Sequence, residues 1–262
     1  MRYTTEELDK VNETYIKCLV NGGPGTGKSF HGLTYPKVAW LVNEPGWKAL
    51  IEANPSLKSN LVWVEEFIPS PSEDVKVVFE RLDKAIDQAH VDFKEGKIQS
   101  LFFDNVSYHA ENRWMYINKY EPVRSATTGA VDTRGMYGTL GRYLYTFTYM
   151  KLLSFPGNVV VSCHEQTEDE EAISRKIDKS MTVAPAILGG FRDKIAGMFT
   201  ASIYLEKRRK AENVYEYWAR CQKGNNRDAK NRCGLPELVQ NVSYRTIMEA
   251  IQKHKQQVSK AN

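Results

Sequence analysis

The chain has 262 residues, a formal net charge of +4 and 42% hydrophobic residues, which suits one large α/β domain with a full core. No apolar stretch approaches the ~20 residues that cross a bilayer, and the first residues are polar, so we expect no membrane contact. Cys18, Cys163, Cys221 and Cys233 are scattered without a CxxC pair, which favours buried thiols over a disulfide frame or a zinc site.

A glycine-rich motif follows the first predicted strand. Residues 15–20 form a short apolar run of strand character. The motif after it reads Gly22, Gly23, Pro24, Gly25, Thr26, Gly27, Lys28 and Ser29, and Phe30 belongs to the helix expected next. In such a loop the backbone N–H groups point at phosphate oxygens, the lysine reaches the outer phosphates and the last hydroxyl ligates magnesium. The motif predicts a site for ATP and Mg²⁺; the alternative is a glycine-rich turn with a stray lysine.

Strands and helices alternate in the next part of the chain. Pro36 limits the first helix to about two turns, and Ser70 to Glu73 fit a capping box for an amphipathic helix that ends at Gly96. Further strands are predicted at residues 37–42, 60–64, 98–103 and 158–163. This order predicts an α/β fold with a mainly parallel central sheet, flanking helices and a ligand site at the carboxyl ends of the strands.

Polar residues that follow three of these strands are candidate site residues. Asp104 comes 75 residues after Ser29, and its carboxylate would hold magnesium beside that hydroxyl. Glu44 would orient or deprotonate the attacking water. The alternative is that Glu44 is only the acidic residue of a Glu-Pro-Gly turn at the end of its strand. His164 would sense the γ-phosphate, although an ordinary hydrogen-bonded histidine is the alternative.

The C-terminal third changes to period-two strands and basic residues. Strands at 201–205 and 214–219, joined by Lys207 to Lys210, predict an antiparallel hairpin. Residues 206–232 contain nine Lys or Arg against four acids, a net charge of +5. Such a region suits nucleic acid, or nucleotide phosphates across a subunit interface; the alternative is a solvated hairpin.

A better candidate for nucleic acid follows Asp104. Aromatic and cationic side chains are interleaved there, as stacking on unpaired bases with neutralisation of the backbone requires. They are Tyr108, Arg113, Trp114, Tyr116, Lys119, Tyr120, Arg124, Arg134 and Tyr137. The alternative is that Trp114 and Tyr116 belong to the core of a helix. The loop after His164 is acidic from Glu165 to Glu171 and would repel phosphate, so only its later part, from Arg175 on, would approach DNA.

The succession of phosphate loop, Glu44, Asp104, His164 and basic hairpin resembles the RecA-like ATPase core, in particular the compact RecA-like P-loop NTPases of phages and prophages. That group includes single-strand annealing recombinases. The resemblance implies an N-terminal extension at residues 1–14, a RecA-like ATPase domain at 15–240 and a C-terminal helical tail at 241–262. It also implies that Glu44 activates water, that Asp104 supports magnesium, and that His164 couples the γ-phosphate to a DNA-binding loop.

These features predict a Mg²⁺-dependent ATPase that acts on single-stranded DNA in phage-type recombination or replication, in the cytoplasm of a bacterial host or infected cell. A homo-oligomer is expected, in which one subunit supplies a finger to the next subunit's phosphates, and a replication or single-strand-binding protein is a further expected partner. The catalytic candidates are Lys28, Glu44 and His164, with Arg227, Lys230 or Arg232 as the finger. Two alternatives remain: a nucleotide-switched loader or adaptor of a replication or packaging machine with slow hydrolysis, and a small-molecule kinase.

Overall fold

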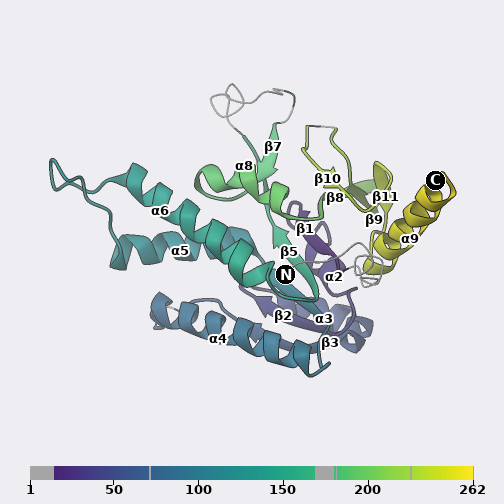
Figure 1. Ribbon diagram of the computed structural model, residues 1–262, viewed down its shortest axis with the longest axis horizontal. Coiled ribbons are helices and arrows are strands. Elements are labelled where there is room, and N and C mark those ends of the chain that lie inside the picture. The colour runs from purple at the N-terminus through teal and green to yellow at the C-terminus, as the bar shows by residue number, and fades with distance from the viewer. Residues whose placement is uncertain (1–14, 71, 169–179, 181, 225, 262) are drawn as a thin grey trace.

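The computed structural model describes residues 15–70, 72–168, 180, 182–224 and 226–261, and its centre is a nine-stranded sheet (Figure 1). The strand order is β11-β9-β8-β1-β5-β4-β2-β3, with β10 beside β8. The strands are β1 (Lys17–Asn21), β2 (Val38–Val42), β3 (Leu61–Glu66), β4 (Ser100–Asp104), β5 (Asn158–Cys163), β8 (Ala201–Ala211), β9 (Val214–Arg220), β10 (Lys230–Asn231) and β11 (Leu238–Gln240). The strands from β3 through β1 to β8 are parallel, and β9, β10 and β11 are antiparallel to their neighbours. The expected α/β fold with a mainly parallel sheet is confirmed.

Helices cover the sheet and extend beyond it. They are α2 (Lys28–Gly32), α3 (Trp47–Ala53), α4 (Val75–Lys94), α5 (Val106–Tyr120), α6 (Thr133–Thr146), α8 (Arg192–Ile195) and α9 (Tyr244–Ala261). Figure 1 shows α5 and α6 as a pair that projects away from the sheet, and α9 at the opposite end of the molecule. A separate two-stranded sheet pairs β6 (Glu165–Thr167) with β7 (Val183–Pro185). Within the described ranges, every helix is too short or too polar to cross a membrane.

Alternate residues of the central strands face two separate cores. On β4, Leu101 and Phe103 face a core that includes α4, α5 and α6, whereas Phe102 faces the core of α2, α3 and α9. Both faces are buried, which is why the strands have near-continuous apolar runs rather than an alternating pattern. Because β1, β2, β4 and β5 are parallel neighbours, the polar residues at their carboxyl ends lie along the same side of the sheet.

The structure corrects the predicted start of α4. Its N-cap is Asp74, whose carboxylate accepts a hydrogen bond from the Lys76 N–H at 2.8 Å, and not Ser70. Glu73, expected to close the capping box, binds Arg81 at 2.7 Å instead. Both Ser70 and Asp74 are good N-cap residues, and the second is followed directly by the apolar helical pattern.

The predicted hairpin is real, but its turn is elsewhere. Lys207 to Lys210 are part of β8, and the connection to β9 is Glu212–Asn213, where Asn213 has a φ of 57°. Cross-strand pairs such as Lys207 with Tyr217 extend the ribbon beyond the core. The basic residues therefore lie along a strand, with their charges on its exposed end, rather than at the tip of a turn.

Candidate functional site

The phosphate loop has a backbone that only glycine accommodates at several positions. Gly25 and Gly27 have φ values of 68° and 96°, which other residues rarely adopt. A Cβ at Gly22 would lie 2.5 Å from Thr26 Oγ1 and 2.9 Å from the Leu205 carbonyl oxygen. The loop is therefore a closed backbone cradle whose glycines are required by its shape, as binding of a phosphate chain by main-chain N–H groups needs.

The Lys28 side chain is buried inside this cradle. Its Nζ donates to the carbonyl oxygens of Gly22 and Gly23, both at 3.0 Å, and lies 3.3 Å from Nδ1 of His164. Burial lowers the pKa of Lys28 below its usual value, although the carboxylates of Glu44 and Asp104 oppose this effect. The ammonium group is thus already held at the loop, where it would meet the oxygens of an outer phosphate.

Asp104 and Ser29 form the pair expected to serve magnesium. Ser29 Oγ donates to Asp104 Oδ2 at 2.7 Å, and Ser162 Oγ donates to Oδ1 of the same carboxylate. Burial raises the pKa of Asp104 to about 6, although both hydroxyl groups oppose the shift. Oxygen donors of this kind fit a hard divalent cation. Within the described residues no three His, Cys, Asp or Glu side chains gather as a metal cluster, so phosphate and water oxygens would have to complete its coordination.

Glu44 and His164 lie beside this pair, joined by Asn105. Asn105 Nδ2 donates to Glu44 Oε2 at 2.5 Å, while its Oδ1 accepts the Tyr108 N–H at 2.9 Å, which fixes the orientation of the amide. His164 Nε2 is 3.6 Å from Glu44 Oε1 and 3.1 Å from Asn105 Nδ2. Asn105 is not singled out by the sequence, and the feature that could have pointed to it is its position directly after Asp104, at the end of a buried strand.

The His164 ring can accept only one hydrogen bond at a time. Burial, followed by the nearby Lys28 ammonium, lowers the pKa of His164 below its usual value, so the ring is neutral at pH 7. A neutral imidazole has one acceptor nitrogen. Lys28 and Asn105 present N–H groups to opposite ring nitrogens. When the ring accepts from Lys28, its Nε2–H faces Glu44, and when it accepts from Asn105, it gives up the bond to Lys28.

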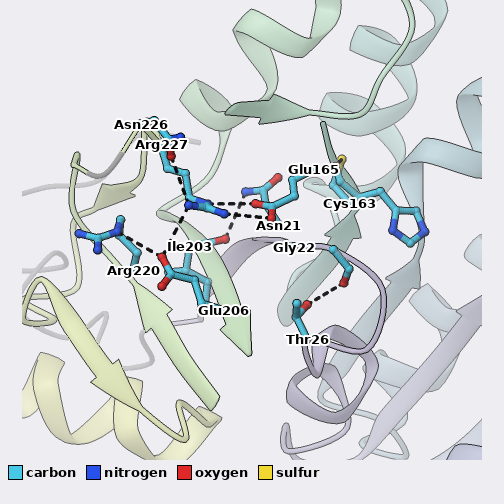
Figure 2. Close-up of polar contacts among 12 residues, drawn as sticks. Asn21, Gly22, Thr26, Cys163, Glu165, Ile203, Glu206, Arg220, Asn226 and Arg227 are labelled. Atoms are coloured by element: carbon cyan, nitrogen blue, oxygen red, sulfur yellow. Dashed lines mark hydrogen bonds and ion pairs between the residues drawn. The ribbon is translucent and has the colours of Figure 1, made fainter. Parts of the chain in front are cut away.

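Arg227 reaches the same edge of the sheet from the loop after β9. Its guanidinium binds both carboxylate oxygens of Glu165, each at 3.0 Å, and lies 3.8 Å from Glu206, which also contacts Arg220 (Figure 2). Glu165 approaches the phosphate loop, since its Oε1 would be 4.0 Å from a Cβ at Gly23. Glu165 is the first residue of the stretch predicted to repel phosphate, and its ion pair with Arg227 offsets its charge. For the stretch as a whole, repulsion of phosphate stays a prediction. The acidic stretch from residue 169 and the cations from Arg175 to Lys179 lie outside the described residues.

The other two finger candidates lie towards the starts of β1 and β8, away from the carboxyl ends of the strands. Lys230 pairs with Ser202 on β8, and Nζ of Lys230 donates to the Gly197 carbonyl at 2.7 Å. The Arg232 N–H donates to Thr200, next to the start of β1, whereas the phosphate loop follows the end of that strand. The structure does not bring Lys230 or Arg232 to the phosphate loop of their own chain.

A cavity of about 670 Å³ opens from the phosphate loop. Its lining includes the loop, Ser29, Glu44 and Asp104, together with several aromatic residues. Phe30 of α2, Trp47 of α3, and Tyr217 and Trp218 of β9 all contribute to its wall. A cradle of glycines, a lysine, an oxygen pair and an adjoining apolar cavity fit a magnesium-bound nucleoside triphosphate.

The aromatic and basic residues after Asp104 are largely engaged within α5 and α6. The Arg113 guanidinium lies between the rings of Tyr116 and Tyr143, 4.3 and 4.2 Å from their centroids, and its side chain is only 12% exposed. Trp114 stacks on Tyr137 with the ring centroids 4.4 Å apart. Trp114 also packs against the core of α4, α5 and α6, and Tyr116 contacts Phe79. These contacts favour the core interpretation for Trp114 and Tyr116, and they enclose Arg113 as well.

A comparison with known protein families finds a match over most of the chain. A model of the protein family described as AAA domain matches residues 14–233, which include the whole phosphate loop, Asp104 and His164. No curated protein matches the chain.

Proposed function

The chain belongs to the AAA domain family, and on this basis we propose that it binds ATP with Mg²⁺ and hydrolyses it at the site formed by Lys28, Ser29, Glu44, Asp104 and His164. The observation that carries the proposal is a pair of contact groups at the phosphate loop. Lys28 lies 3.3 Å from His164, which lies 3.6 Å from Glu44, while Ser29 donates to Asp104 at 2.7 Å. Asn105, the residue after Asp104, contacts both Glu44 and His164 and so joins the two groups. A bound magnesium ion would neutralise charge on the phosphates.

Each residue has a role that its contacts support. Lys28 binds the outer phosphate oxygens and gives up its bonds to the loop carbonyls in exchange. Glu44 accepts a proton from the attacking water, and its Oε2 is held in place by Asn105. Once phosphate attracts Lys28, His164 is released to accept from Asn105, so the ring reports whether the outer phosphate is present.

Paired substitutions test the proposal by separating binding from turnover. Lys28→Ala should greatly weaken ATP binding and abolish hydrolysis, because the ammonium neutralises phosphate in both the ground and transition states. Glu44→Gln should keep ATP binding and lose turnover, because an amide does not accept the proton. Lys58→Ala and Glu52→Gln, on exposed positions outside the cavity, are the controls. Wild-type turnover in Lys28→Ala would reject the site.

We further propose that single-stranded DNA stimulates this activity. The support is the exposed basic end of β8, where Lys207, Arg209 and Lys210 are all exposed and, among the described residues, only Lys210 forms an ion pair, with Glu216 at 2.8 Å. Measuring ATPase rates with and without single-stranded DNA tests it, and the stimulation should fall as salt rises. A rate that ignores DNA would instead favour the nucleotide-switched loader or adaptor.

A homo-oligomer follows as a proposal from the position of the finger candidates. Because Lys230 and Arg232 lie away from their own phosphate loop, they could act only on a neighbouring subunit. Alanine at Arg232 should then reduce hydrolysis while ATP affinity is kept, and mixing this variant with Lys28→Ala should restore part of the rate. A monomer by light scattering with no such rescue would reject the shared site.

A further inference from the structure

The outward side of α6, in the helix pair that projects from the sheet, differs from the solvent side of an ordinary surface helix (Figure 1). α6 continues into a π-helical turn, η2 (Phe147–Leu152), and its inner residues, such as Leu140, belong to the core that it shares with α4 and α5. Such a helix normally presents charged residues of both signs to water. On α4, for example, both Glu80 and Lys84 are exposed. The outward side of α6 instead presents arginine, tyrosine and methionine.

Five exposed residues define this surface, which we call the α6 face: Arg134, Arg142, Tyr145, Tyr149 and Met150. Arg142, Tyr145 and Tyr149 recur at the spacing of three and four residues that places side chains on one side of a helix. Tyr145, Tyr149 and Met150 are 49%, 58% and 65% exposed, and the two tyrosine rings are stacked with their centroids 6.0 Å apart. Single exposed apolar residues are normal, but a group of them marks a contact site.

The α6 face carries only positive charge. No Asp or Glu occurs at residues 133–164 of the sequence. Arg142 donates to the Thr139 hydroxyl at 3.2 Å, and within the part of the chain that the structure describes neither Arg134 nor Arg142 forms an ion pair. Both guanidinium groups can therefore pair with carboxylates of another molecule.

We propose that the α6 face binds an acidic segment of another protein that carries apolar side chains beside its carboxylates. Aromatic residues, methionine and arginine are enriched at protein–protein interfaces, whereas lysine, glutamate and aspartate are depleted there and are absent from the exposed residues of α6. Tyrosine and arginine are also frequent among the residues that supply most of the binding energy. Carboxylates of the partner would pair with Arg134 and Arg142, and its apolar side chains would cover the tyrosine pair and Met150. The inference goes beyond the proposed ATPase activity and does not depend on it.

Two other occupants match this surface less well. If the face paired with itself in a second copy of the chain, the same two arginines would meet without any acid between them. Single-stranded DNA needs phosphate contacts at short intervals, and Arg134 and Arg142 are about 12 Å apart along the helix, since eight residues separate them. The exposed end of β8 has three exposed cations within residues 207–210 and suits phosphate better. Met150 also offers a base no ring on which to stack.

Fluorescence anisotropy with three labelled peptides of equal length tests the proposal on the full chain. One peptide alternates aspartate with leucine or phenylalanine, the second has lysine in place of each aspartate, and the third has serine in place of each apolar residue. The chain should bind the first peptide more tightly than the other two, and this binding should weaken as salt rises. Tyr149→Ser should weaken it roughly 5- to 30-fold, and Arg142→Gln should weaken it and reduce its salt dependence.

Matched variants on the β8–β9 ribbon are the controls. Tyr215→Ser and Arg209→Gln change an exposed tyrosine and an exposed arginine in the same way and should leave peptide binding unchanged. All four side chains are exposed, so the thermal melts should match the wild type. Arg209→Gln should reduce any response to single-stranded DNA, whereas Arg142→Gln should not.

The proposal is overturned if the wild type does not bind the acidic apolar peptide, or binds the lysine peptide equally well. It is also overturned if Tyr149→Ser and Arg142→Gln bind as the wild type does, or if the ribbon variants lose as much affinity. A dimer in light scattering that Tyr149→Ser dissociates would assign the α6 face to a second copy of the chain. A selective loss of DNA binding in Arg142→Gln would assign it to nucleic acid, and either assignment rejects the acidic protein segment.

Discussion

Replacing Gly32 by alanine probes the packing that holds the phosphate-loop helix against the sheet. A Cβ at Gly32 would lie 2.5 Å from two ring atoms of Phe102 and 2.7 Å from a third, so the helix or the ring must move by about 1 Å. Phe102 is fully buried and stacked on Trp40, with the ring centroids 5.8 Å apart, so the ring has little space to yield. We therefore expect α2 to move, at a cost of about 1–3 kcal/mol in the free energy of unfolding.

Thermal melting measures this cost, and an alanine elsewhere provides the control. A change of 1 kcal/mol shifts Tm by about 2–4 °C in a chain of this size, so Gly32→Ala should lower Tm by several degrees. At Gly141, in the middle of α6, a Cβ meets nothing within 4 Å, and alanine there should raise stability by about 0.5–1 kcal/mol. Because Lys28 and Ser29 belong to the displaced helix, Gly32→Ala should also weaken ATP binding. A wild-type Tm together with wild-type ATP affinity would refute the reasoning.

Three further predictions concern other parts of the molecule. Arg227→Gln should weaken ATP binding by uncovering the Glu165 charge beside the phosphate loop, and adding Glu165→Gln should restore the affinity; additive losses in this double-mutant cycle would argue against the pairing. Burial, with a smaller effect of Arg113, lowers the pKa of His109 to about 3 in the folded chain. In the unfolded chain the same ring has its ordinary pKa of about 6.5, so between these values only the unfolded chain is protonated at His109, and the folded state loses stability as pH falls. Urea unfolding should therefore show about 2 kcal/mol lost from this group between pH 7 and pH 5, and His109→Gln should reduce that loss. Trp114→Ala should lower stability by roughly 3 kcal/mol through lost core packing, whereas an unchanged melt with a selective loss of DNA binding would assign Trp114 to a DNA channel.

The sequence was sufficient for those parts of the site that depend on short segments. A glycine pattern and four apolar runs predicted β1, β2, β4 and β5, and the sheet places the polar residues after them at one edge. The reason is physical: parallel strands buried on both faces need continuous apolar sequence, and their carboxyl ends meet by geometry. The contacts of His164 with Lys28 and Glu44, and of Ser29 with Asp104, follow from that arrangement.

Contacts between distant segments were beyond such reasoning. Lys207 to Lys210 have the composition of a turn, and only the pairing of Lys207 to Arg209 with Tyr215 to Tyr217 makes this segment part of a strand. Arg227 is paired with Glu165, 62 residues away, and nothing local distinguishes it from Lys230 or Arg232. Arg113 is a residue type that often binds phosphate, but here its guanidinium is enclosed by aromatic rings of two different helices, α5 and α6. The sequence shows which residues carry a charge, but it does not show which of these charges are already paired with another side chain in the folded protein.

The register between β1 and β8 explains how the C-terminal strands come to form part of the proposed nucleotide site. Asn21, the last residue of β1, is paired with Tyr204, and from there β8 continues past the phosphate loop to pair with β9. That continuation carries Glu206 toward Arg227 and places the ring of Tyr217 against Gly27. A slip of one residue would turn both side chains to the opposite face of the sheet. Main-chain pairing therefore fixes the phosphate loop and the adjoining cavity wall together, so the antiparallel ribbon has a structural role in the site besides any contact with DNA.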